Sequence, residues 1–416
     1  MKRENETGDN SETLEYSDNQ SLIAELRGFK TFRELRASEA YQRHSSYLAE
    51  LLGIPRLYPA RKTQLHIRDF VRIAHWNIEK GKHLDAVSKT FLEHAVLRDA
   101  DLISINEADV GMNRSGHRFV ARELGKALGM HVLFAPAYLE FSKGYGEDLK
   151  MPGENTIALQ GNAILSRYEL HNPRIIKLPI CFKHYEHVEK RIGTRNAVAA
   201  EVEINDRKMT FVSTHLEVRQ TPACRARQIK AIIDALQLAG TADAAIIAGD
   251  FNTNAIARGG WYRTIRASLR LSFADKGRLE HIFANPQPSE PLFTHLRENG
   301  FTERGFNNSA TTCIVPMRGF EDRTTLPKFL ADAFEQRMSR FNHRLDFRLD
   351  WIVGRGIKPL GDGDLIDSAS GIVSRSPQSI AGLVNENGGQ ISDHDPITAD
   401  IIINHGSTRM RRIDAD

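Results

Sequence analysis

Short apolar runs recur along this chain from about residue 70, and polar side chains follow most of them directly. Runs of this length that are rich in β-branched residues and bounded by turns are typical of buried strands. Helical segments and turns separate them, so the pattern predicts a layered α/β domain. The runs are VRIAHWN (71–77), DLISINE (101–107), VAAEVEI (198–204), MTFVSTH (209–215), AAIIAGD (244–250), LDWIVG (349–354) and ITADIII (397–403).

Two local signals support this interpretation. The Asn205-Asp206 pair lies between two consecutive strand-like runs and predicts a hairpin. A helix is predicted over 221–240, because Thr221 suits the N-cap, a proline follows at the first helical position, and Gly240 suits the end.

The N-terminal part, residues 1–66, differs from the rest and is interpreted as an extension. Residues 1–20 are polar and offer too few apolar groups to offset the entropy of ordering, so we expect them to be disordered. Residues 21–52 carry apolar side chains at three- and four-residue spacing, which predicts amphipathic helix with a break near Gly28.

Residues 67–404 are predicted to form the catalytic domain, and 405–416 a tail. The strand signal fades between about 255 and 345, where several prolines and glycines occur together with a predicted helix over 325–341. This stretch is interpreted as an insertion beside the strand ends, and we expect it to govern substrate choice.

The composition is that of a globular protein. The chain has 416 residues, of which 41% are hydrophobic and 26% charged, and its net charge is +3. These values exclude global disorder, and the balanced charge argues against a histone-like basic coat while allowing a local basic groove.

The cysteines and the N-terminus bear on the compartment. Only Cys181, Cys224 and Cys313 occur, far apart and with no CxxC pair, so we expect no disulfide framework. The N-terminus is polar and lacks the apolar core of a secretory signal. No apolar run approaches the ~18–20 residues that span a bilayer. A cytoplasmic protein without a transmembrane segment is therefore predicted.

The polar residues at the strand ends form a chemically coherent set. Asn77, Glu107 and Asp393 offer hard oxygen ligands, which suit Mg²⁺ or Mn²⁺, and the lack of a Cys/His cluster argues against zinc. Such a metal polarises a phosphoryl oxygen and offsets charge in the transition state. Asp250 would orient or deprotonate the attacking water, and Asn252 would hydrogen-bond the phosphoryl oxygens.

Histidines complete the set. His215 and His394 would bracket the phosphate as donors. An Asp–His pair fixes the tautomer of an imidazole, and Asp350 is the candidate partner of His394. A single Asp or Asn after a strand is more often a turn residue than a ligand, but six such sites in one chain make coincidence an inadequate explanation.

Seven segments resemble the endonuclease/exonuclease/phosphatase superfamily, which has the DNase I-like fold. They occur in the order typical of that family, and the resemblance covers about residues 70–404. GDFN followed by SDH is a fairly specific combination. The segments are WNIE (76–79), INEAD (105–109), GNAILSR (161–167), STHLE (213–217), GDFNT (249–253), LDWI (349–352) and SDHDP (392–396).

The resemblance implies a four-layered α/β sandwich, with two packed, mainly antiparallel sheets flanked by helices, and divalent-metal-dependent phosphoester hydrolysis. It implies these roles: Asn77 and Glu107 as the metal pair, Asp250 and Asn252 as water-activating and transition-state-binding residues, Asp350–His394 as the Asp–His pair, Asp393 as a second acidic metal or water contact, and His215 and, more loosely, Arg195 on the phosphate.

Several assignments stay open at this stage. Glu79 could contact metal or pair with a nearby lysine, and Asn162 could be a turn former or a site residue. Asp350 is preferred to Asp346 because the apolar strand follows it directly. Tyr138 and Tyr145 could form a substrate lip. Three arginines could reach a phosphate backbone, although a solvated helix face is the preferred interpretation; they are Arg219, Arg225 and Arg227.

Three functions compete. We expect a metal-dependent phosphodiesterase that acts on nucleic acid, for which backbone phosphate contacts supply most of the binding. The alternative is a sphingomyelinase-like enzyme or one acting on a small phosphoester. A scaffold that keeps the fold without the chemistry is disfavoured, because every core position holds a competent residue.

Overall fold

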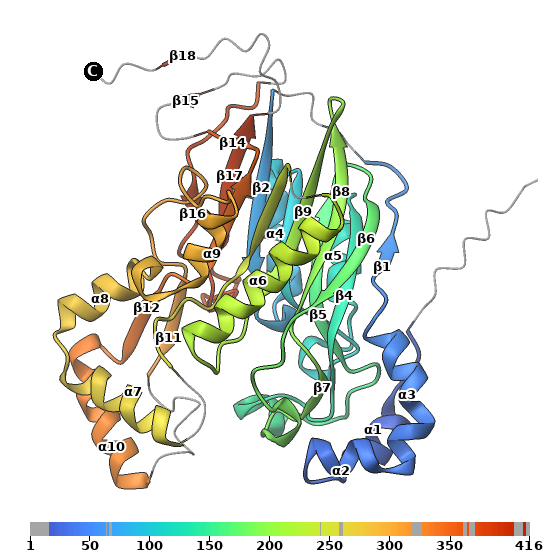
Figure 1. Cartoon of the computed structure of the whole chain (residues 1–416), viewed down its shortest axis with the longest axis vertical. Coiled ribbons are helices and arrows are strands. Elements are labelled where there is room, and N and C mark those ends of the chain that lie inside the picture. The colour runs from blue at the N-terminus through green and yellow to red at the C-terminus, as the bar shows by residue number, and fades with distance from the viewer. Residues whose placement is uncertain are drawn as a thin grey trace, which may run out of the picture.

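Two packed β-sheets form the centre of the computed structural model (Figure 1), which describes residues 16–63, 65, 69–241, 243–257, 261–317, 327–360, 364–365, 371–402 and 411–412. The first sheet has the order β1 (Arg56–Tyr58), β4 (His131–Glu140), β5 (Leu159–Ser166), β3 (Leu102–Val110), β2 (Phe70–Asn77), β17 (Ile397–Ile402) and β14 (Lys358–Pro359), with β7 (Arg191–Gly193) on β4 and β16 (Gln378–Ser379) on β17. The second has the order β13 (Asp350–Arg355), β10 (Ala245–Asp250), β9 (Arg207–His215), β8 (Asn196–Ile204) and β6 (His171–Lys177). Most pairs are antiparallel, whereas β2–β3 and β9–β10 are parallel.

The central strands are apolar throughout because both of their faces are covered. In β2, Val71 and Ile73 face the second sheet, whereas Ala74 and Trp76 belong to the core beneath the outer helices. In the second sheet, Ile246 faces inward and its neighbour on β10 faces the helices. The period of two thus places successive residues in different cores, each apolar.

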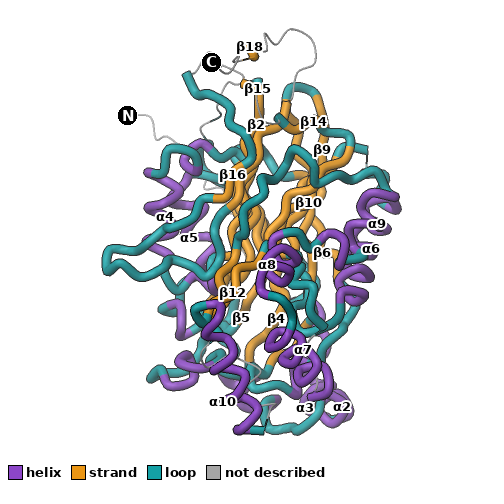
Figure 2. Tube along the Cα trace, turned by 90° about the vertical axis from the view of Figure 1, so that its left-hand side faces the viewer, coloured by secondary structure: helices purple, strands orange, loops and turns teal. Residues whose placement is uncertain are grey.

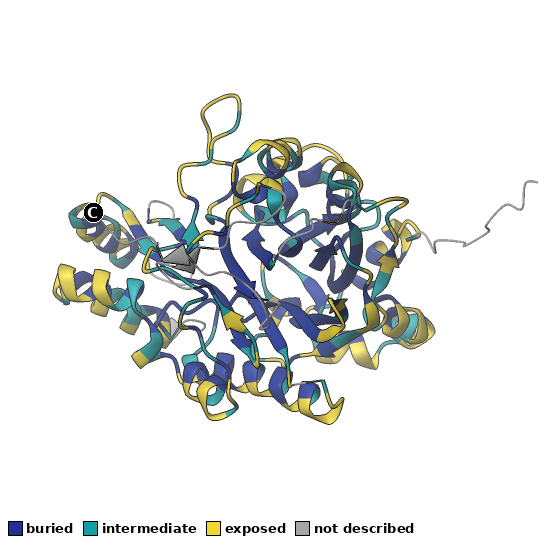
Figure 3. Cartoon of the chain, turned by 90° about the horizontal axis from the view of Figure 1, so that it is seen from above, coloured by how far each residue is buried: buried dark blue, intermediate teal, exposed yellow. Residues whose placement is uncertain are grey.

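Helices complete the layers. Figure 2 shows α4 (Leu84–Glu93) and α5 (Val120–Leu128) on one side of the strands, and α6 (Pro222–Leu238) and α9 (Leu292–Glu298) on the other. Seen from above, the strands are buried and the exposed residues lie on the outer faces of the helices (Figure 3). The predicted four-layered sandwich is confirmed.

The predicted hairpin and helix are confirmed as well. Asn205 and Asp206 both have positive φ (50° and 61°), as a two-residue hairpin turn requires. Thr221 is the N-cap of α6, and Gly240, with φ 65°, follows its end.

The N-terminal helices pack on the outer face of the first sheet. They are α1 (Gln20–Leu26), α2 (Phe32–Ala37) and α3 (Glu39–Leu51), and Gly28 lies in the break between the first two. The expectation of disorder over 1–20 is wrong for residues 16–19, because Tyr16 packs against Phe119 and Phe134 and Asn19 is buried. Residues 1–15 and the boundaries near 66 and 404 lie outside the described residues.

The insertion has a core of its own. It contains α7 (Trp261–Phe273), α8 (Lys276–Ala284), β11 (Cys313–Pro316), α10 (Lys328–Arg337), a 3-10 turn (Met338–Phe341) and β12 (Arg344–Phe347). The predicted helix at 325–341 is present over 328–341. Helix α9 instead packs on α6, so this part of 255–345 belongs to the sandwich.

The expectation of no disulfide is wrong. Cys181 and Cys224 are 43 residues apart in sequence, but the fold brings their Cα atoms to 6.3 Å and they form a disulfide. It joins the segment after β6 to the first turn of α6, while Cys313 is free and buried. Cysteine usage therefore no longer supports the predicted compartment. Within the described part of the chain, every helix is too short or too polar to cross a bilayer.

A buried ion pair ties β2 to β17 and carries our first prediction. Arg72 donates to both carboxylate oxygens of Asp400, at 2.8 and 2.7 Å, and both side chains are 1% exposed. Asp400→Ala removes the closest carboxylate from a buried guanidinium, which keeps Asp99 at 3.7 Å, so we expect the free energy of unfolding to fall by about 3 kcal/mol. Urea denaturation measures it.

The matched control is Asp346→Ala. This carboxylate pairs with Arg344, but both side chains are about half exposed. The expected loss is at most about 1 kcal/mol. Equal losses for the two variants would contradict the prediction.

Candidate active site

Strand register gathers the first part of the site around Asp250. This residue ends β10, where it pairs with His215 on parallel β9 and with Asp350 on antiparallel β13. Its Oδ2 lies 3.2 Å from His215 Nε2 and 3.7 Å from His394 Nε2. Asn77, the last residue of β2, donates from Nδ2 to the same oxygen at 3.2 Å. Side chains from four segments far apart in sequence therefore meet at one carboxylate.

Asn252 holds Asp250 in place. The backbone N–H of Asn252 donates to Asp250 Oδ1 at 2.9 Å. The Nδ2 group of Asn252 donates to Asp250 Oδ2 at 3.2 Å and to the Leu216 carbonyl at 3.0 Å. Asn252 has φ 52°, a left-handed conformation that asparagine tolerates better than most residues. In this arrangement its amide orients the carboxylate.

The predicted Asp–His pair is present and has a second histidine. His394 Nδ1 lies 2.7 Å from Asp350 Oδ2, and His75 Nε2 lies 2.9 Å from Asp350 Oδ1. Thr312 Oγ1 also donates to Oδ2, at 2.6 Å. All three partners and Asp350 itself are buried. The two histidines therefore contact different oxygens of the same carboxylate.

Charge decides which imidazole is protonated. Burial lowers the pKa of His394, but the carboxylates of Asp350 and Asp250 outweigh it and hold this pKa well above its ordinary value. His394 is therefore an imidazolium at neutral pH, with Nδ1–H donated to Asp350. Burial and the charge of Arg195 lower the pKa of His215, which keeps its imidazole neutral.

Two hydrogen bonds from side chains to backbone carbonyls hold the loop that carries His394. Trp76 Nε1 donates to the His394 carbonyl at 2.8 Å, and Ser392 Oγ donates to the Asn77 carbonyl at 2.7 Å. The C-terminal loop is thus anchored to the end of β2. This anchoring fixes His394 relative to Asn77 although 317 positions separate them in sequence.

A second group of oxygens lies beside Asp250. A bulge in β3 interrupts its register with β5 between Ile105 and Ala108, and Glu107 has φ 59° there. Bulges re-aim side chains, and this one brings Glu107 Oε1 to 3.5 Å from Asn77 Nδ2. Burial raises the pKa of Glu107, but the charges of Lys80 and Arg195 outweigh it and hold the pKa below its usual value. Glu107 is therefore an ionised carboxylate, a group of the kind that divalent cations bind.

Asp393, which is solvent-exposed immediately before the buried His394, offers a further carboxylate. Desolvation by the surrounding protein and the neighbouring charges of Glu79 and Glu107 raise the pKa of Asp393 to about 6, with His394 opposing. Crowded carboxylates with this perturbation are stabilised by a metal ion, and carboxylate and amide oxygens are the donors that Mg²⁺ prefers. Asn77, Glu107 and Asp393 fit such an ion.

Two other metal-capable groups occur among the described residues, and both share His394. They are Asp250–Asp350–His394 and Cys313–Asp393–His394. Both oxygens of Asp350 already accept hydrogen bonds from the histidines and from Thr312. Burial raises the pKa of the Cys313 thiol to about 12, so it is not the thiolate that zinc prefers. Asn77, Glu107 and Asp393 therefore remain the better candidate ligands for a divalent cation.

Arg195 lies just before β8 and is 7% exposed. Its guanidinium carbon is 5.9 Å from the Tyr138 ring centre, and its Nε has no hydrogen-bond partner. A buried guanidinium with a free N–H beside a site of this chemistry is available to an anion.

The structure shows the surroundings of four residues whose roles the sequence left open. Glu79 pairs with Lys82 at 3.3 Å, and Asp346 pairs with Arg344 away from Asp350. Asn162 is buried in β5, where it bridges Asn106 and Asn196 between the sheets, so it is not a turn former. Tyr138 is buried and forms no lip.

The solvated-face interpretation of the arginines is wrong for two of the three. Arg225 is buried and donates from Nε to Glu290 at 3.0 Å, and Glu290 in turn accepts the N–H of Ala255. Arg219 is 7% exposed and contacts His187. Only Arg227 is exposed. Contacts with distant segments cover the other two, which the periodicity of one helix cannot show.

Sequence reasoning missed His75, Thr312 and Lys80. His75 lies in the first apolar run, two residues before Asn77, and this alternation was a usable signal. The sequence around Thr312 carried no such signal. Lys80 has φ 67° and makes ion pairs with Asp148 (3.8 Å) and Glu189 (4.0 Å).

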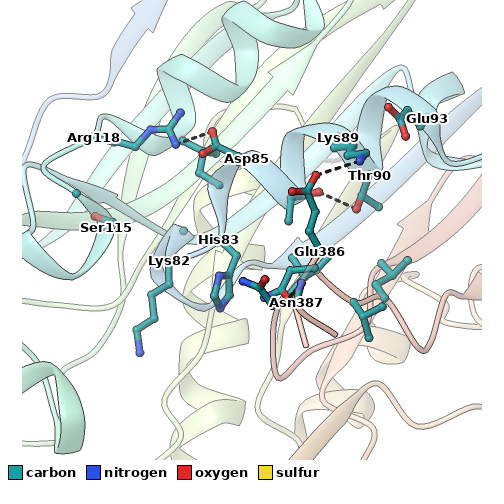
Figure 4. Close-up of a pocket in the computed structure, with 18 of the residues that line it drawn as sticks. Lys82, His83, Asp85, Lys89, Thr90, Glu93, Ser115, Arg118, Glu386 and Asn387 are labelled. Atoms are coloured by element: carbon teal, nitrogen blue, oxygen red, sulfur yellow. Dashed lines mark hydrogen bonds and ion pairs between the residues drawn. The ribbon is translucent and has the colours of Figure 1, made fainter. Parts of the chain in front are cut away.

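A cleft of about 950 Å³ opens beside the site. Its lining residues include Gly81 and Lys82, which follow Asn77 closely in sequence, and Ile391, which lies two residues before Asp393 in sequence. Figure 4 shows its walls, which the ion pairs Lys89–Glu386 and Arg118–Asp85 stabilise at 3.2 and 2.7 Å. The predicted catalytic and metal-binding residues do not line it.

A family model covers most of the chain. Residues 74–394 match the model of the Endonuclease/Exonuclease/phosphatase family, and the chain belongs to that family, whose members are hydrolases acting on phosphoester bonds. No curated protein matches the chain significantly.

Solved structures of low sequence identity are also similar. An endonuclease/exonuclease/phosphatase family protein from Leptotrichia buccalis is 16% identical, with 80% of this chain and 100% of that chain covered and a TM-score of 0.45. The human Nocturnin catalytic domain with bound sulfate is 16% identical (83% and 96% covered, TM-score 0.44). The 3'-5' exonuclease from Neisseria meningitidis is 14% identical (80% and 100% covered, TM-score 0.44).

Proposed function

We propose that the protein is a divalent-metal-dependent phosphodiesterase that hydrolyses nucleic acid. The observation that carries this proposal is the convergence on Asp250 of His215, Asn77 and His394, at 3.2–3.7 Å, beside the oxygen group of Glu107 and Asp393. In-line displacement at phosphorus needs a carboxylate that orients water, a cationic donor to the phosphoryl oxygens, and oxygen ligands for a divalent metal. This group of residues offers all three.

Each group has a defined task in this reaction. Asp250 accepts a hydrogen bond from the attacking water and holds it in line with the scissile bond. His394, kept charged by Asp350, donates from Nε2 to a phosphoryl oxygen. The free N–H of Arg195 supplies a further donor to the phosphate, and His215, whose Nε2 faces Asp250, lies beside it. A metal held by Asn77, Glu107 and Asp393 would polarise the phosphoryl group and offset its developing charge.

The cleft beside the site supports a polymeric substrate. A nucleic acid continues on both sides of its scissile phosphate, and a space of about 950 Å³ can receive several of its atoms beyond the reacting group. A phospholipid head group or a small phosphoester is the alternative.

The test is nicking of supercoiled plasmid by the purified chain with Mg²⁺ or Mn²⁺, with EDTA and His394→Ala as negative controls. His171→Ala, which alters an exposed histidine on β6, is the matched control and should nick normally. Cleavage that survives EDTA or His394→Ala would contradict the mechanism. Absence of nicking together with hydrolysis of bis(p-nitrophenyl) phosphate would keep the chemistry and reject nucleic acid.

The metal role of Glu107 yields a separate prediction. Glu107→Gln removes one ionised oxygen ligand, and changes even to outer-shell groups cost about 10–100-fold in metal affinity. We therefore expect the Mg²⁺ concentration for half-maximal activity to rise at least about tenfold, measured by a metal titration of the initial rate.

Glu203→Gln is its matched control. This carboxylate is about half exposed on β8 and pairs with Lys208 at 3.8 Å, so we expect its titration to move by less than about threefold. An unchanged titration for Glu107→Gln, or an equal shift in both variants, would contradict the ligand assignment.

A further inference from the structure

Two helices of the insertion, α7 and α10, present large apolar side chains to solvent in one place. Leu269 and Phe273 on α7 are 51% and 69% exposed, and Phe329 on α10 is 71% exposed. Figure 1 shows the two helices next to each other at one end of the molecule. Single exposed apolar residues need no explanation, but a group of them marks an interaction surface.

Leu269 and Phe273 line a groove of about 590 Å³ between the helices, and Phe329 precedes Leu330, another of its lining residues. Its apolar lining includes Ile265, Leu269 and Phe273 from α7 and Leu330 from α10. None of its lining residues is acidic. We call this groove and its rim the α7–α10 face.

Positive charge surrounds the apolar surface. Helices α7 and α10 and the 3-10 turn carry six arginines and lysines and two acids, a net charge of +4, whereas the whole chain carries +3. Helix α7 contains three arginines and no acid. On the groove itself, the guanidinium of Arg337 lies 5.3 Å from the Phe273 ring centre, and Arg340 lines the same wall. The two acids, Asp332 and Glu335, lie outside the lining.

We propose that the α7–α10 face docks on an anionic lipid surface. An occupant must supply apolar groups for the groove and negative charge for the arginines, and the boundary between head groups and acyl chains of an anionic bilayer supplies both. A second copy of this face would bring +4 against +4, so charge opposes self-association. A nucleic acid would match the charge but leave the leucine and phenylalanines exposed.

The core of the insertion connects the α7–α10 face to segments next to the proposed active site in sequence. Ile256, six residues after Asp250, and Leu349, immediately before Asp350, both belong to the core of the insertion. The surface and the proposed reaction nevertheless use different residues. Binding can therefore be measured without turnover, and its failure would leave the phosphodiesterase proposal untouched.

The experiment is sedimentation of the full chain with vesicles of phosphatidylcholine alone or mixed with phosphatidylglycerol. In about 0.1 M salt, where the Debye length is about 10 Å, we expect binding to the anionic vesicles only, and weaker binding at higher salt. The Leu269→Ser/Phe273→Ser double variant should bind at least about fivefold more weakly. Leu238→Ser, at the 92% exposed end of α6, is the matched control and should bind normally.

Three results would overturn the proposal. They are equal binding to neutral and anionic vesicles, no binding to either, and equal effects of the double and control variants. A change of oligomeric state in the double variant, seen by light scattering, would assign the face to self-association instead. Thermal unfolding verifies that the exposed substitutions leave the fold intact, and hydrolysis of a soluble diester verifies that they leave the reaction intact.

Discussion

Replacement of Asp250 by asparagine is expected to lower kcat by about 10³-fold while the protein stays folded. The amide has nearly the same shape, but its NH2 group cannot accept hydrogen bonds, so it keeps only part of the network donated by Asn77 and Asn252. It loses the negative charge that orients and polarises the attacking water. It also removes the partner that His215 and His394 face at 3.2 and 3.7 Å. Because the lost interaction belongs to the transition state, KM should change far less than kcat.

Steady-state hydrolysis of bis(p-nitrophenyl) phosphate at saturating metal measures this effect without assuming the natural substrate. Asp234→Asn is the matched control, since Asp234 is about half exposed on α6 and pairs with Lys230 at 2.7 Å. Activity within threefold of wild type in Asp250→Asn would exclude the proposed role of this carboxylate. A large rise in KM at constant kcat would assign it to substrate binding instead.

Replacement of His394 by alanine should have an effect of similar size, about 10³-fold in kcat. The imidazolium is the donor whose charge Asp350 maintains, and nothing else among the described residues occupies its position beside Asp250. The alanine leaves a gap that free imidazole can enter, so added imidazole should restore part of the activity. Rescue distinguishes a missing donor from a distorted site.

His75 provides the comparison for His394. It grips the other oxygen of Asp350 at 2.9 Å but is fully buried and faces no substrate space. His75→Gln should therefore cost only about tenfold, through the orientation of Asp350, and should not respond to imidazole. If His394→Ala keeps full activity, or if His75→Gln is the more damaging change, the assignment of the two histidines is wrong.

The candidate site could largely be found from the sequence because its members end apolar strands. Asn77, His215 and Asp250 are each the last residue of a strand, so local pattern alone marked them. The GDFN and SDH segments marked Asp250 and His394 together. Their roles stay predictions, because the structure shows their geometry and not their reaction.

The sequence pattern could not predict the surroundings of residues that contact segments far away in the chain. Arg225 is a charged residue that periodicity alone would place on a solvated face, yet it is buried, and Glu290, 65 positions away, pairs with it. Cys181 and Cys224 carried no spacing signal, since only the packing of α6 against the second sheet brings them together. Thr312 has no local pattern at all, and its role arises from contact with Asp350.

The sequence by itself determined the strands, the hairpin at Asn205-Asp206, the layered class and the type of chemistry, because periodicity, turn residues and side-chain donors are local properties. Only the tertiary structure decided that Asp350 holds two histidines, that a bulge turns Glu107 toward Asn77, and that the insertion exposes an apolar and cationic face. These features depend on strand register and on contacts between segments hundreds of residues apart. Cooperative burial of the whole chain sets such contacts, and no short window of sequence contains that information.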